Sequence, residues 1–398
     1  MKNHYQILIV GGGNAGISVA AQLLLKDPNL DIGILEPSDK HYYQPAWTLV
    51  GGGQFNVADT VREQSDVMPD NVEWIRKYAD TFTPEKNTVI TRDQIAFTYD
   101  YLVVSPGIQL RWEWVEGLQE TLGKNNVCSN YSFDQCTYTW DVVKDFNGGT
   151  ALFTSPGTPV KCGGAPQKIM YLASDIFNRK GVLKNTNVEF CNAGKVIFGV
   201  KKYAKTLQKV VDNYGIKANH RHDLIKIDGP NKKATFKVTD SEGKTSEVVK
   251  DFDLIHVTPP QSAPEFIIHS PLADEKGWID VNKYTMQHKR YNNIFGLGDA
   301  TNTPNAKTGA AVRKQAPVVV QNLLALMNNL PLPAQYNGYG SCPLVTGIGK
   351  LILAEFDYEG QPAESFPFDQ SQERFSMYML KKNVLPWMYW NKILKGTA

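Results

Sequence analysis

The sequence predicts an α/β protein built on Rossmann-like dinucleotide-binding units, and three observations indicate this fold class. The apolar run of residues 7–10 is followed at once by a glycine cluster and a helix-compatible stretch. A second apolar run, residues 31–35, ends at an acid. Residues 292–300 repeat the order of apolar strand, glycine turn and acid. Strands that alternate with helices in this way are typical of a parallel sheet covered by helices.

The first glycine cluster matches the spacing of a nucleotide-binding loop. Gly11, Gly13 and Gly16 fit G-x-G-x-x-G, which supplies a tight turn, close backbone approach to a pyrophosphate and close helix packing. Glu36 follows at the distance where a carboxylate accepts a hydrogen bond from a ribose hydroxyl. Glu36 alone also fits a surface acid, but the strand, glycines, helix, second strand and acid together predict a dinucleotide site.

The late segment completes the pattern. Gly298 and Asp299 form a turn ahead of a helical stretch from about 308 to 328, where helix-terminal amides lie near a second phosphate or a ribityl chain. Residues 99–107 read as a crossing strand that ends in a turn at Gly107, although this end also fits a plain turn. The arrangement resembles the two-dinucleotide-domain flavoproteins, whose FAD domain is interrupted by a second Rossmann-like domain.

This resemblance implies three regions. Residues 1–110 and 251–330 are expected to form the FAD-binding domain, residues 111–250 the second Rossmann-like domain, and residues 331–398 a C-terminal region at the quinone or membrane interface. The second domain lacks an NAD fingerprint, because residues 187–202 contain only Gly194 and Gly199 where a pyrophosphate needs bare backbone. We therefore expect no NAD(P)H site and a small electron donor.

Composition excludes several classes. With 42 Lys plus Arg against 40 Asp plus Glu, the formal charge of +2 excludes a polybasic nucleic-acid binder. No apolar run approaches the ~18 residues of a membrane span, and residues 1–5 lack a signal-peptide or transit pattern. The five cysteines contain no CxxC pair and the histidines no metal spacing, so no metal site is expected. His41 is expected to pack or to hydrogen-bond rather than to catalyse.

Two cysteines have unusual surroundings. Cys162 follows Lys161 and precedes two glycines and a helix start at Pro166, so positive potential is expected to lower its pKa. Cys342 lies in a second glycine-flanked loop. Both also fit buried structural cysteines, although thiols in polar, glycine-rich loops are poor core candidates.

Five segments together are similar to the sulfide:quinone oxidoreductases, in the branch of the mitochondrial enzymes: GGGNAGISVA, HYYQPAWTLVGGG, SPGTPVKCGGAPQKIMYL, FGLGDATNTPNAKTGAAVRKQAP and GYGSCPLVTG. The resemblance implies that Cys162 and Cys342 are the redox pair beside FAD. It also implies that sulfide is oxidised through this relay, that sulfane sulfur passes to a small acceptor and that two electrons pass to a membrane quinone. The resemblance places Cys342 nearer the flavin and makes Cys162 the persulfide carrier. Cys128 and Cys136 are expected to be structural, and Cys191 to lie in the core.

The resemblance also implies the residues that contact FAD, with the pyrophosphate on the glycine loop, the ribose at Glu36, the adenosine near Gln44 and Ala79, and the flavin near the late turn and helix start. The full set is Gly11, Gly13, Asn14, Ala15, Gly16, Glu36, Gln44, Ala79, Gly107, Gly298, Asp299, Lys307, Thr308 and Gly309. Lys168 and Lys381 are candidates for a cationic lining that attracts HS⁻, and both also fit ordinary surface lysines.

From residue 372 onwards, aromatic and aliphatic residues interleave with lysines around Pro386. This pattern predicts a pair of short helices at a membrane surface, or a helical hairpin that closes the core. We expect a peripheral protein on a respiratory membrane, either bacterial or mitochondrial inner membrane. A type II NADH:quinone oxidoreductase and a non-catalytic FAD-fold binding protein are the alternatives. The sulfur acceptor, the quinone, the membrane face and a homo-oligomer stay open.

Overall fold

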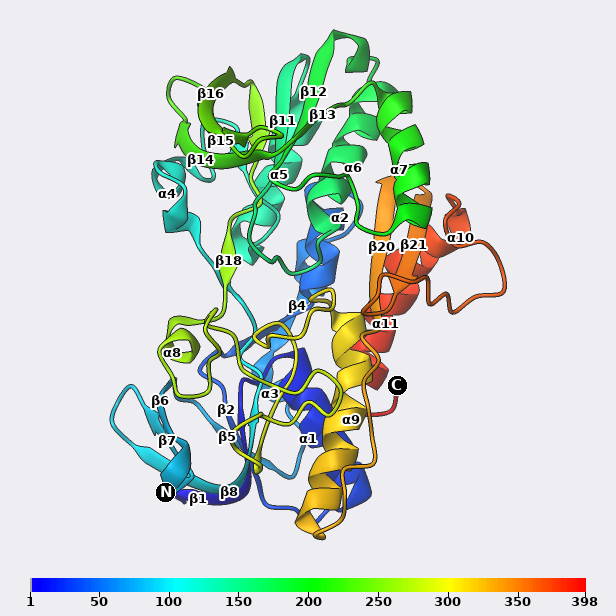
Figure 1. Ribbon diagram of the computed structural model, residues 1–398. Helices are drawn as coiled ribbons and strands as arrows, with labels where there is room; N and C mark the ends of the chain where they lie inside the picture. The colour runs from blue at the N-terminus through cyan, green and yellow to red at the C-terminus, as the bar shows by residue number, and fades with distance from the viewer. Residues whose placement is uncertain (1) are drawn as a thin grey trace.

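The computed structural model describes residues 2–398 and shows two large sheets, one at each end of an elongated molecule (Figure 1); the first is mostly parallel, with antiparallel pairing at β6, β7 and β8. The first sheet has the order β5-β2-β1-β8-β7-β6, with β19 paired to β8. Its apolar strands are buried on both faces, as in parallel sheets that helices cover. Its strands are β1 (His4–Val10), β2 (Ile32–Leu35), β5 (Val72–Ile75), β6 (Ala79–Thr83), β7 (Thr88–Thr91), β8 (Ala96–Val104) and β19 (Ile294–Gly296).

Two long helices lie side by side on the first sheet. They are α1 (Asn14–Lys26), which follows β1, and α9 (Gly309–Met327), which follows β19. The predicted strands at 7–10, 31–35, 99–107 and 292–300 and the helix at 308–328 correspond to β1, β2, β8, β19 and α9. Short elements around this sheet are β3 (Lys40–Tyr42), β4 (Val61–Glu63), α3 (Gln64–Val67) and α8 (Glu265–Ile268), whereas α2 (Trp47–Gly51) packs on helices of the second sheet.

The second sheet has the order β10-β17-β11-β12-β13 and is parallel throughout. Its strands are β10 (Val127–Cys128), β11 (Gly149–Ser155), β12 (Thr186–Asn192), β13 (Lys217–His220) and β17 (Leu254–His256). Its helices are α5 (Phe133–Asp145), α6 (Ala165–Arg179) and α7 (Lys201–Tyr214), and a small helix α4 (Leu118–Thr121) lies nearby. The antiparallel strands β14 (His222–Asp228), β15 (Lys233–Thr239) and β16 (Thr245–Asp251) flank this sheet, and β9 (Gln109–Leu110) pairs with β18 (Gln261–Ser262) between the two bodies.

Two sheets agree with the expectation of two Rossmann-like units, and the mixed α/β fold class is confirmed. The domain boundaries at 110, 250 and 330 stay predictions. Cys128, Cys136 and Cys191 are all buried, and all five cysteines are free thiols.

The C-terminal region starts with the hairpin β20 (Gly340–Gly347) and β21 (Lys350–Phe356), which packs on α6. The expectation of two short helices around Pro386 is wrong. Residues 375–393 form one helical run of α10 (Phe375–Met379), a π-helical turn (Leu380–Val384), α11 (Leu385–Met388) and a second π-helical turn (Tyr389–Ile393). Pro386 is the second residue of α11 and directly follows the first π-helical turn. Proline has no N–H to donate to the preceding turn, and a local π-helical turn is one way in which a helix continues past such a position.

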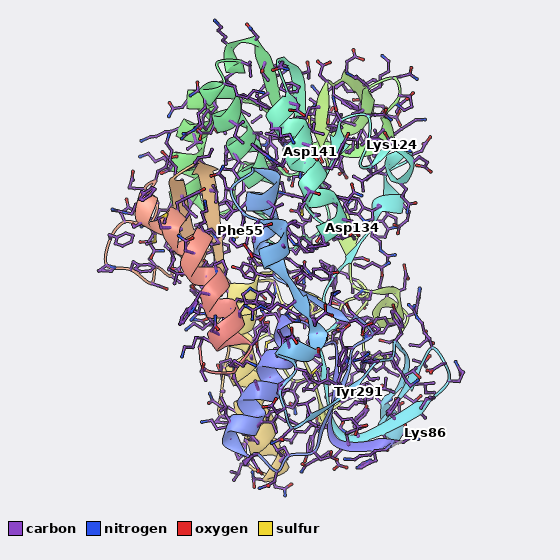
Figure 2. The ribbon with its side chains drawn as sticks, turned by 180° about the vertical axis from the view of Figure 1, so that it is seen from behind. Phe55, Lys86, Lys124, Asp134, Asp141 and Tyr291 are labelled. Carbon is purple, nitrogen blue, oxygen red and sulfur yellow. The ribbon has the colours of Figure 1, made fainter. Side chains whose placement is uncertain are left out.

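This helical run packs partly against the core. Seen from behind, Phe55 lies beside it (Figure 2), and its side chain contacts three separate apolar clusters. Tyr389 and Trp390 are buried with Leu394 against α1. Phe375, Met379, Val384 and Trp387 are exposed. Within residues 2–398, no helix is long and apolar enough to cross a bilayer.

Candidate active site

The two sequence-predicted cysteines lie together although 180 residues separate them in the chain. Cys162 is in the loop between β11 and α6, and Cys342 is the third residue of β20. Their thiols are within hydrogen-bonding reach of each other. Gly164 permits this approach, because a Cβ at this position would lie 2.4 Å from Leu344 Cδ2 and 3.7 Å from Cys342 Cβ. The packing of the β20–β21 hairpin on α6 therefore creates the pair.

The backbone of Cys162 is unusual. Its φ of 55° is in the left-handed region, which non-glycine residues seldom adopt and which is often found at functional sites. Its N–H donates to the carbonyl of Lys307 at 2.8 Å, and its own carbonyl accepts from the N–H of Ala165 at 2.7 Å. These bonds fix the thiol between the start of α6 and the segment that leads into α9. The flanking glycines suggested a turn, but they did not predict this conformation at the cysteine itself.

Two buried lysines face the thiols. Lys168 Nζ is 3.0 Å from Cys162 Sγ, and Lys381 Nζ donates to the carbonyl of Pro45 at 2.7 Å. The hydrogen bond with Cys342 holds the pKa of Cys162 well below its ordinary value, and both lysines act in the same direction. That shared hydrogen bond, together with burial, raises the pKa of Cys342. Cys162 is therefore the thiolate of the pair and Cys342 the thiol.

The lysine that stabilises the thiolate differs from the one the sequence suggested. Lys161 Nζ points away from the sulfur and donates to Gln44 Oε1 at 2.6 Å and to the carbonyl of Tyr131 at 3.2 Å. Burial lowers the pKa of Lys161 to about 8. Burial and the nearby Lys168 lower the pKa of Lys381 to about 7. Both predicted cationic candidates, Lys168 and Lys381, are thus buried beside the thiols and not on the surface.

The glycine loop after β1 has the geometry that its pattern predicts. Gly11 has φ of 101°, and a Cβ there would lie 2.4 Å from the carbonyl oxygen of Ser105. A Cβ at Gly16 would lie 1.9 Å from the Gly11 carbonyl oxygen, so only glycine lets α1 begin so close to the turn. Around Gly13, by contrast, a Cβ would meet no atom of residues 2–398 within 4 Å other than those of Gly13 and its two chain neighbours. This open position leaves the backbone accessible to a ligand.

The N-termini of α1 and α9 converge on this loop. Asn14 Nδ2 is 3.5 Å from the position of a Cβ at Gly309, and the Cβ of Ala15 is 3.6 Å from that at Gly298. Thr308 caps α9 through its side chain. Helix N-termini present unpaired N–H groups and positive potential, which favour phosphate. The converging helix ends and the open glycine therefore fit a dinucleotide with its diphosphate at α1.

The remaining predicted FAD contacts lie in several places. The Glu36 carboxylate accepts hydrogen bonds at 2.8 Å from the N–H groups of Gly12 and Ser38, and burial raises its pKa. Ala79 is buried at the start of β6, and Gly107 has φ of 78° after β8. Gln44 is exposed and bonded to Lys161, next to Cys162. The contacts of these four predicted residues with the nucleotide stay predictions.

Asp299 and Lys307 form a charged pair near the start of α9. Burial raises the pKa of Asp299, while burial lowers that of Lys307 to about 8. Lys307 Nζ donates to the carbonyl of Thr301 at 2.8 Å and lies 4.2 Å from the centre of the Trp278 ring. Lys307 is therefore held by the protein and is not a solvated helix-start lysine.

Sequence reasoning missed a group of buried polar side chains beside Cys162. The Tyr131 hydroxyl, Thr258 Oγ1 and Gln261 Nε2 are buried. The first two interact with each other, and beyond that contact none of the three has a hydrogen-bond partner in the part of the chain that the structure describes. Tyr131 is also electrostatically coupled to both thiols, Cys162 more than Cys342. Buried polar atoms without partners are rare in proteins and indicate a bound group. Tyr131 and Thr258 follow strands β10 and β17 of the second sheet, and Gln261 begins β18, so only the fold brings these three side chains together.

The loop that would carry an NAD fingerprint is filled by its own side chains. Asn192 accepts from the N–H of Gly194 at 2.8 Å and donates to the carbonyl of Val196 at 2.9 Å. Ile197 and Val200 are buried in the second core. This packing is consistent with the expectation that the second sheet binds no pyrophosphate, which stays a prediction.

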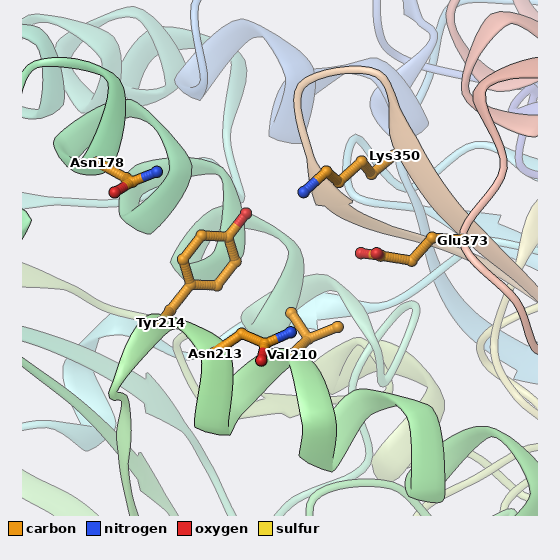
Figure 3. A pocket seen from close by; sticks show the side chains of 6 residues that line it. All are labelled: Asn178, Val210, Asn213, Tyr214, Lys350 and Glu373. Atoms are coloured by element: carbon orange, nitrogen blue, oxygen red, sulfur yellow. The ribbon is translucent and has the colours of Figure 1, made fainter.

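A pocket of about 200 Å³ lies elsewhere, between α6, α7 and the far end of the β20–β21 hairpin (Figure 3). It is lined by Asn178, Val210, Asn213, Tyr214, Lys350 and Glu373, none of which is a predicted site residue. Among residues 2–398, no group of three or more His, Cys, Asp or Glu side chains is arranged to hold a metal. The absence of a metal from the reaction stays a prediction.

Comparison with known proteins gives close relatives over the whole chain. The chain is 44% identical to the mitochondrial sulfide:quinone oxidoreductase of Mus musculus, over 99% of this chain and 87% of that protein. It is 47% identical to the mitochondrial sulfide:quinone oxidoreductase of Dictyostelium discoideum, over 100% of this chain and 87% of that protein. No family model matches the chain.

Solved structures show the same fold. The sulfide:quinone oxidoreductase of the hyperthermophilic bacterium Aquifex aeolicus has a TM-score of 0.81 and 20% identity, covering 100% of this chain and 92% of that chain. The NDH2 of Plasmodium falciparum in complex with NADH has a TM-score of 0.57 and 13% identity, covering 76% of this chain and 65% of that chain. NDH2 is therefore only a distant structural neighbour.

Proposed function

The chain belongs to the sulfide:quinone oxidoreductase family, and from this premise we propose that it oxidises sulfide at Cys162 and Cys342 and passes two electrons through FAD to a quinone. The observation that carries the residue assignment is the pairing of the two thiols with Lys168 against one of them. A thiolate and a thiol in contact are the reduced form of a redox pair.

The proposed cycle starts from the Cys162–Cys342 disulfide. Hydrosulfide attacks the sulfur of Cys162, which breaks the S–S bond, forms a persulfide on Cys162 and leaves Cys342 as a thiolate that takes up a proton. A nucleophilic acceptor then removes the outer sulfur, and Cys162 departs as a thiolate. Lys168 stabilises that leaving thiolate. The two reduced cysteines lose two electrons and re-form the disulfide, so that sulfide, acceptor and quinone yield sulfurated acceptor and quinol.

The residues around the glycine loop fit FAD. The open backbone at Gly13 and the N-terminus of α1 would hold the diphosphate, and the N-terminus of α9 at Gly309 would lie near the flavin. When bound, FAD supplies a two-electron acceptor for the thiols and a two-electron donor for quinone. On the thiol side of this cradle, partly buried charge comes from Lys161, Lys307 and Asp299.

We propose that the exposed side chains of Phe375, Met379, Val384 and Trp387 lie on a membrane surface. An interfacial helix presents apolar and aromatic side chains to the bilayer and needs no span. The mitochondrial names of the relatives support a mitochondrial membrane as the location. A quinone would then reach FAD from the lipid, and the sulfur acceptor would be a small molecule.

Serine variants of the two cysteines test the proposal. Cys162→Ser and Cys342→Ser are expected to abolish sulfide-dependent quinone reduction while retaining FAD, because each removes one sulfur of the relay. Cys136→Ser is the matched control, since this buried thiol lies on α5 outside the pair. Near-normal turnover in either relay variant would contradict the mechanism.

Anaerobic titration of the purified protein separates the alternatives. Sulfide is expected to bleach the flavin absorbance of the wild type, and NADH is expected to leave it unchanged. Bleaching by NADH would favour a type II NADH:quinone oxidoreductase. A flavin that neither reagent reduces would indicate a binding protein without turnover.

A further inference from the structure

His41 lies buried between the C-terminal helical run and the glycine loop, and it is only 3% exposed. Its Nε2 is 2.6 Å from the hydroxyl of Tyr389, and its Nδ1 is 3.2 Å from Gln64 Oε1. Gln64 Nε2 then donates to the carbonyl of Gly12 at 2.8 Å. An unbroken chain of hydrogen bonds thus joins residue 389 to residue 12.

Each link fixes the direction of the next. Because the amide nitrogen of Gln64 donates to Gly12, its oxygen must accept from His41 Nδ1. His41 is then the tautomer with its proton on Nδ1, so Nε2 accepts the proton of the Tyr389 hydroxyl. Burial lowers the pKa of His41 to about 4, which keeps the imidazole neutral at physiological pH. The three hydrogen bonds from Tyr389 to Gly12 therefore have one consistent set of donors and acceptors.

The hydrogen bond from Gln64 to the Gly12 carbonyl determines where the N–H of Gly13 points. A trans peptide is planar, so the carbonyl of Gly12 and the N–H of Gly13 point in opposite directions. Gln64 holds the Gly12 carbonyl toward its own side chain, and the N–H of Gly13 therefore points away from Gln64. Residue 13 is also the position where a Cβ would meet nothing within 4 Å beyond its two chain neighbours. Glu36 fixes the preceding peptide by accepting from the N–H of Gly12.

The C-terminal run that carries Tyr389 is firmly packed in this place. Trp390 meets the His41 ring edge-on at 5.8 Å between ring centres, and Arg62 lies 4.4 Å from the centre of the Trp390 ring. Ser18, on α1, donates to the carbonyl of Ile393 at 3.3 Å. The hydroxyl of Tyr389 is therefore held at a fixed position relative to α1 and the loop before it.

We propose that Tyr389, His41 and Gln64 are positioning residues that orient the Gly12–Gly13 peptide toward the diphosphate of the dinucleotide, which makes the C-terminal helical run part of the cofactor site. The inference rests on the proposed FAD site and goes beyond it, because it assigns a cofactor-binding role to a segment nearly 380 residues from the loop. The segment that presents an apolar surface to the membrane thereby also stabilises the bound nucleotide.

FAD titration of the full-length apoprotein tests this inference. Tyr389→Phe removes the hydroxyl that holds the His41 tautomer, and we expect FAD to bind roughly three- to tenfold more weakly, the loss of about one neutral hydrogen bond. Gln64→Met removes the donor to the Gly12 carbonyl and is expected to weaken FAD binding at least as much as Tyr389→Phe does. Tyr43→Phe is the matched control, because Tyr43 packs against Tyr389 in the same cluster and its hydroxyl is outside the chain of bonds.

Competition with ADP and with adenosine distinguishes positioning from a general loss of structure. The Tyr389→Phe variant should lose affinity for ADP, which carries a diphosphate, and keep its affinity for adenosine, with a melting temperature equal to that of Tyr43→Phe. Equal FAD affinity in Tyr389→Phe and wild type, or an equal loss for ADP and adenosine, would overturn the inference and leave the proposed function intact. Failure of the wild-type apoprotein to bind FAD would instead overturn the proposed function.

Discussion

Replacing Lys168 by methionine tests the electrostatics of the thiol pair most directly. Methionine keeps a long unbranched side chain in the space of Lys168 but removes the ammonium group 3.0 Å from Cys162 Sγ. Because Lys168 is only 3% exposed, water does not screen this contact. Hydrogen bonds to charged groups are worth about 1.5–3 kcal/mol. At about 1.4 kcal/mol for each factor of ten, the ratio of thiolate to thiol at Cys162 should fall roughly 10- to 150-fold.

The assay is the rate of alkylation of Cys162 by iodoacetamide as a function of pH, in reduced protein, with the modified peptide quantified by mass spectrometry. In Lys168→Met the midpoint of this profile should move to higher pH, because the cation that favours the thiolate is gone. Lys161→Met is the control, since its ammonium faces Gln44 and Tyr131. An unchanged profile in Lys168→Met would refute the reasoning and leave the hydrogen bond with Cys342 and the charge of Lys381 as the causes.

Three further predictions concern other parts of the site. The pKa of Lys381 is about 7 in the folded protein and 10.5 ordinarily, so the unfolded chain binds more protons between these values; stability to urea should rise with pH across this window, and Lys381→Met should flatten the rise. Phe375→Ser with Trp387→Ser should weaken co-sedimentation with lipid vesicles at least about tenfold, because two exposed apolar side chains are lost; binding equal to wild type would place the membrane surface elsewhere. Tyr131→Phe should slow sulfide turnover roughly tenfold, the loss of about one hydrogen-bond donor, whereas Tyr99→Phe, which also removes a buried unpartnered hydroxyl but in the first sheet, should not.

Local sequence patterns predicted the parts of the site that depend on backbone conformation. The glycine loop, the start of α9 and the strand before each follow from glycine spacing and apolar runs, since only glycine tolerates the approach at Gly11 and Gly16. The position of Lys168 was also within reach of local reasoning. It is the fourth residue of α6, and helical side chains point back toward the N-terminus, where Cys162 lies.

Contacts between distant segments could not be predicted in this way. Lys381 reaches the carbonyl of Pro45 across 336 residues, and Tyr389 reaches His41 across 348. The aromatic composition of the C-terminal run did not indicate which side chains face the protein. Trp387 is 56% exposed while Tyr389 is 6% exposed. At 3.6 residues per turn, side chains two residues apart point to opposite faces of a helix, but composition alone does not say which face meets the protein.

The hydrogen bond from the N–H of Cys162 to the carbonyl of Lys307 joins a loop of the second sheet to the segment before α9 on the first sheet. It ties the two parts together mechanically, because a movement of one sheet relative to the other would have to move Cys162 and the segment before α9 together. In the proposed reaction this tie keeps the sulfur of Cys162 in a fixed place relative to the start of α9.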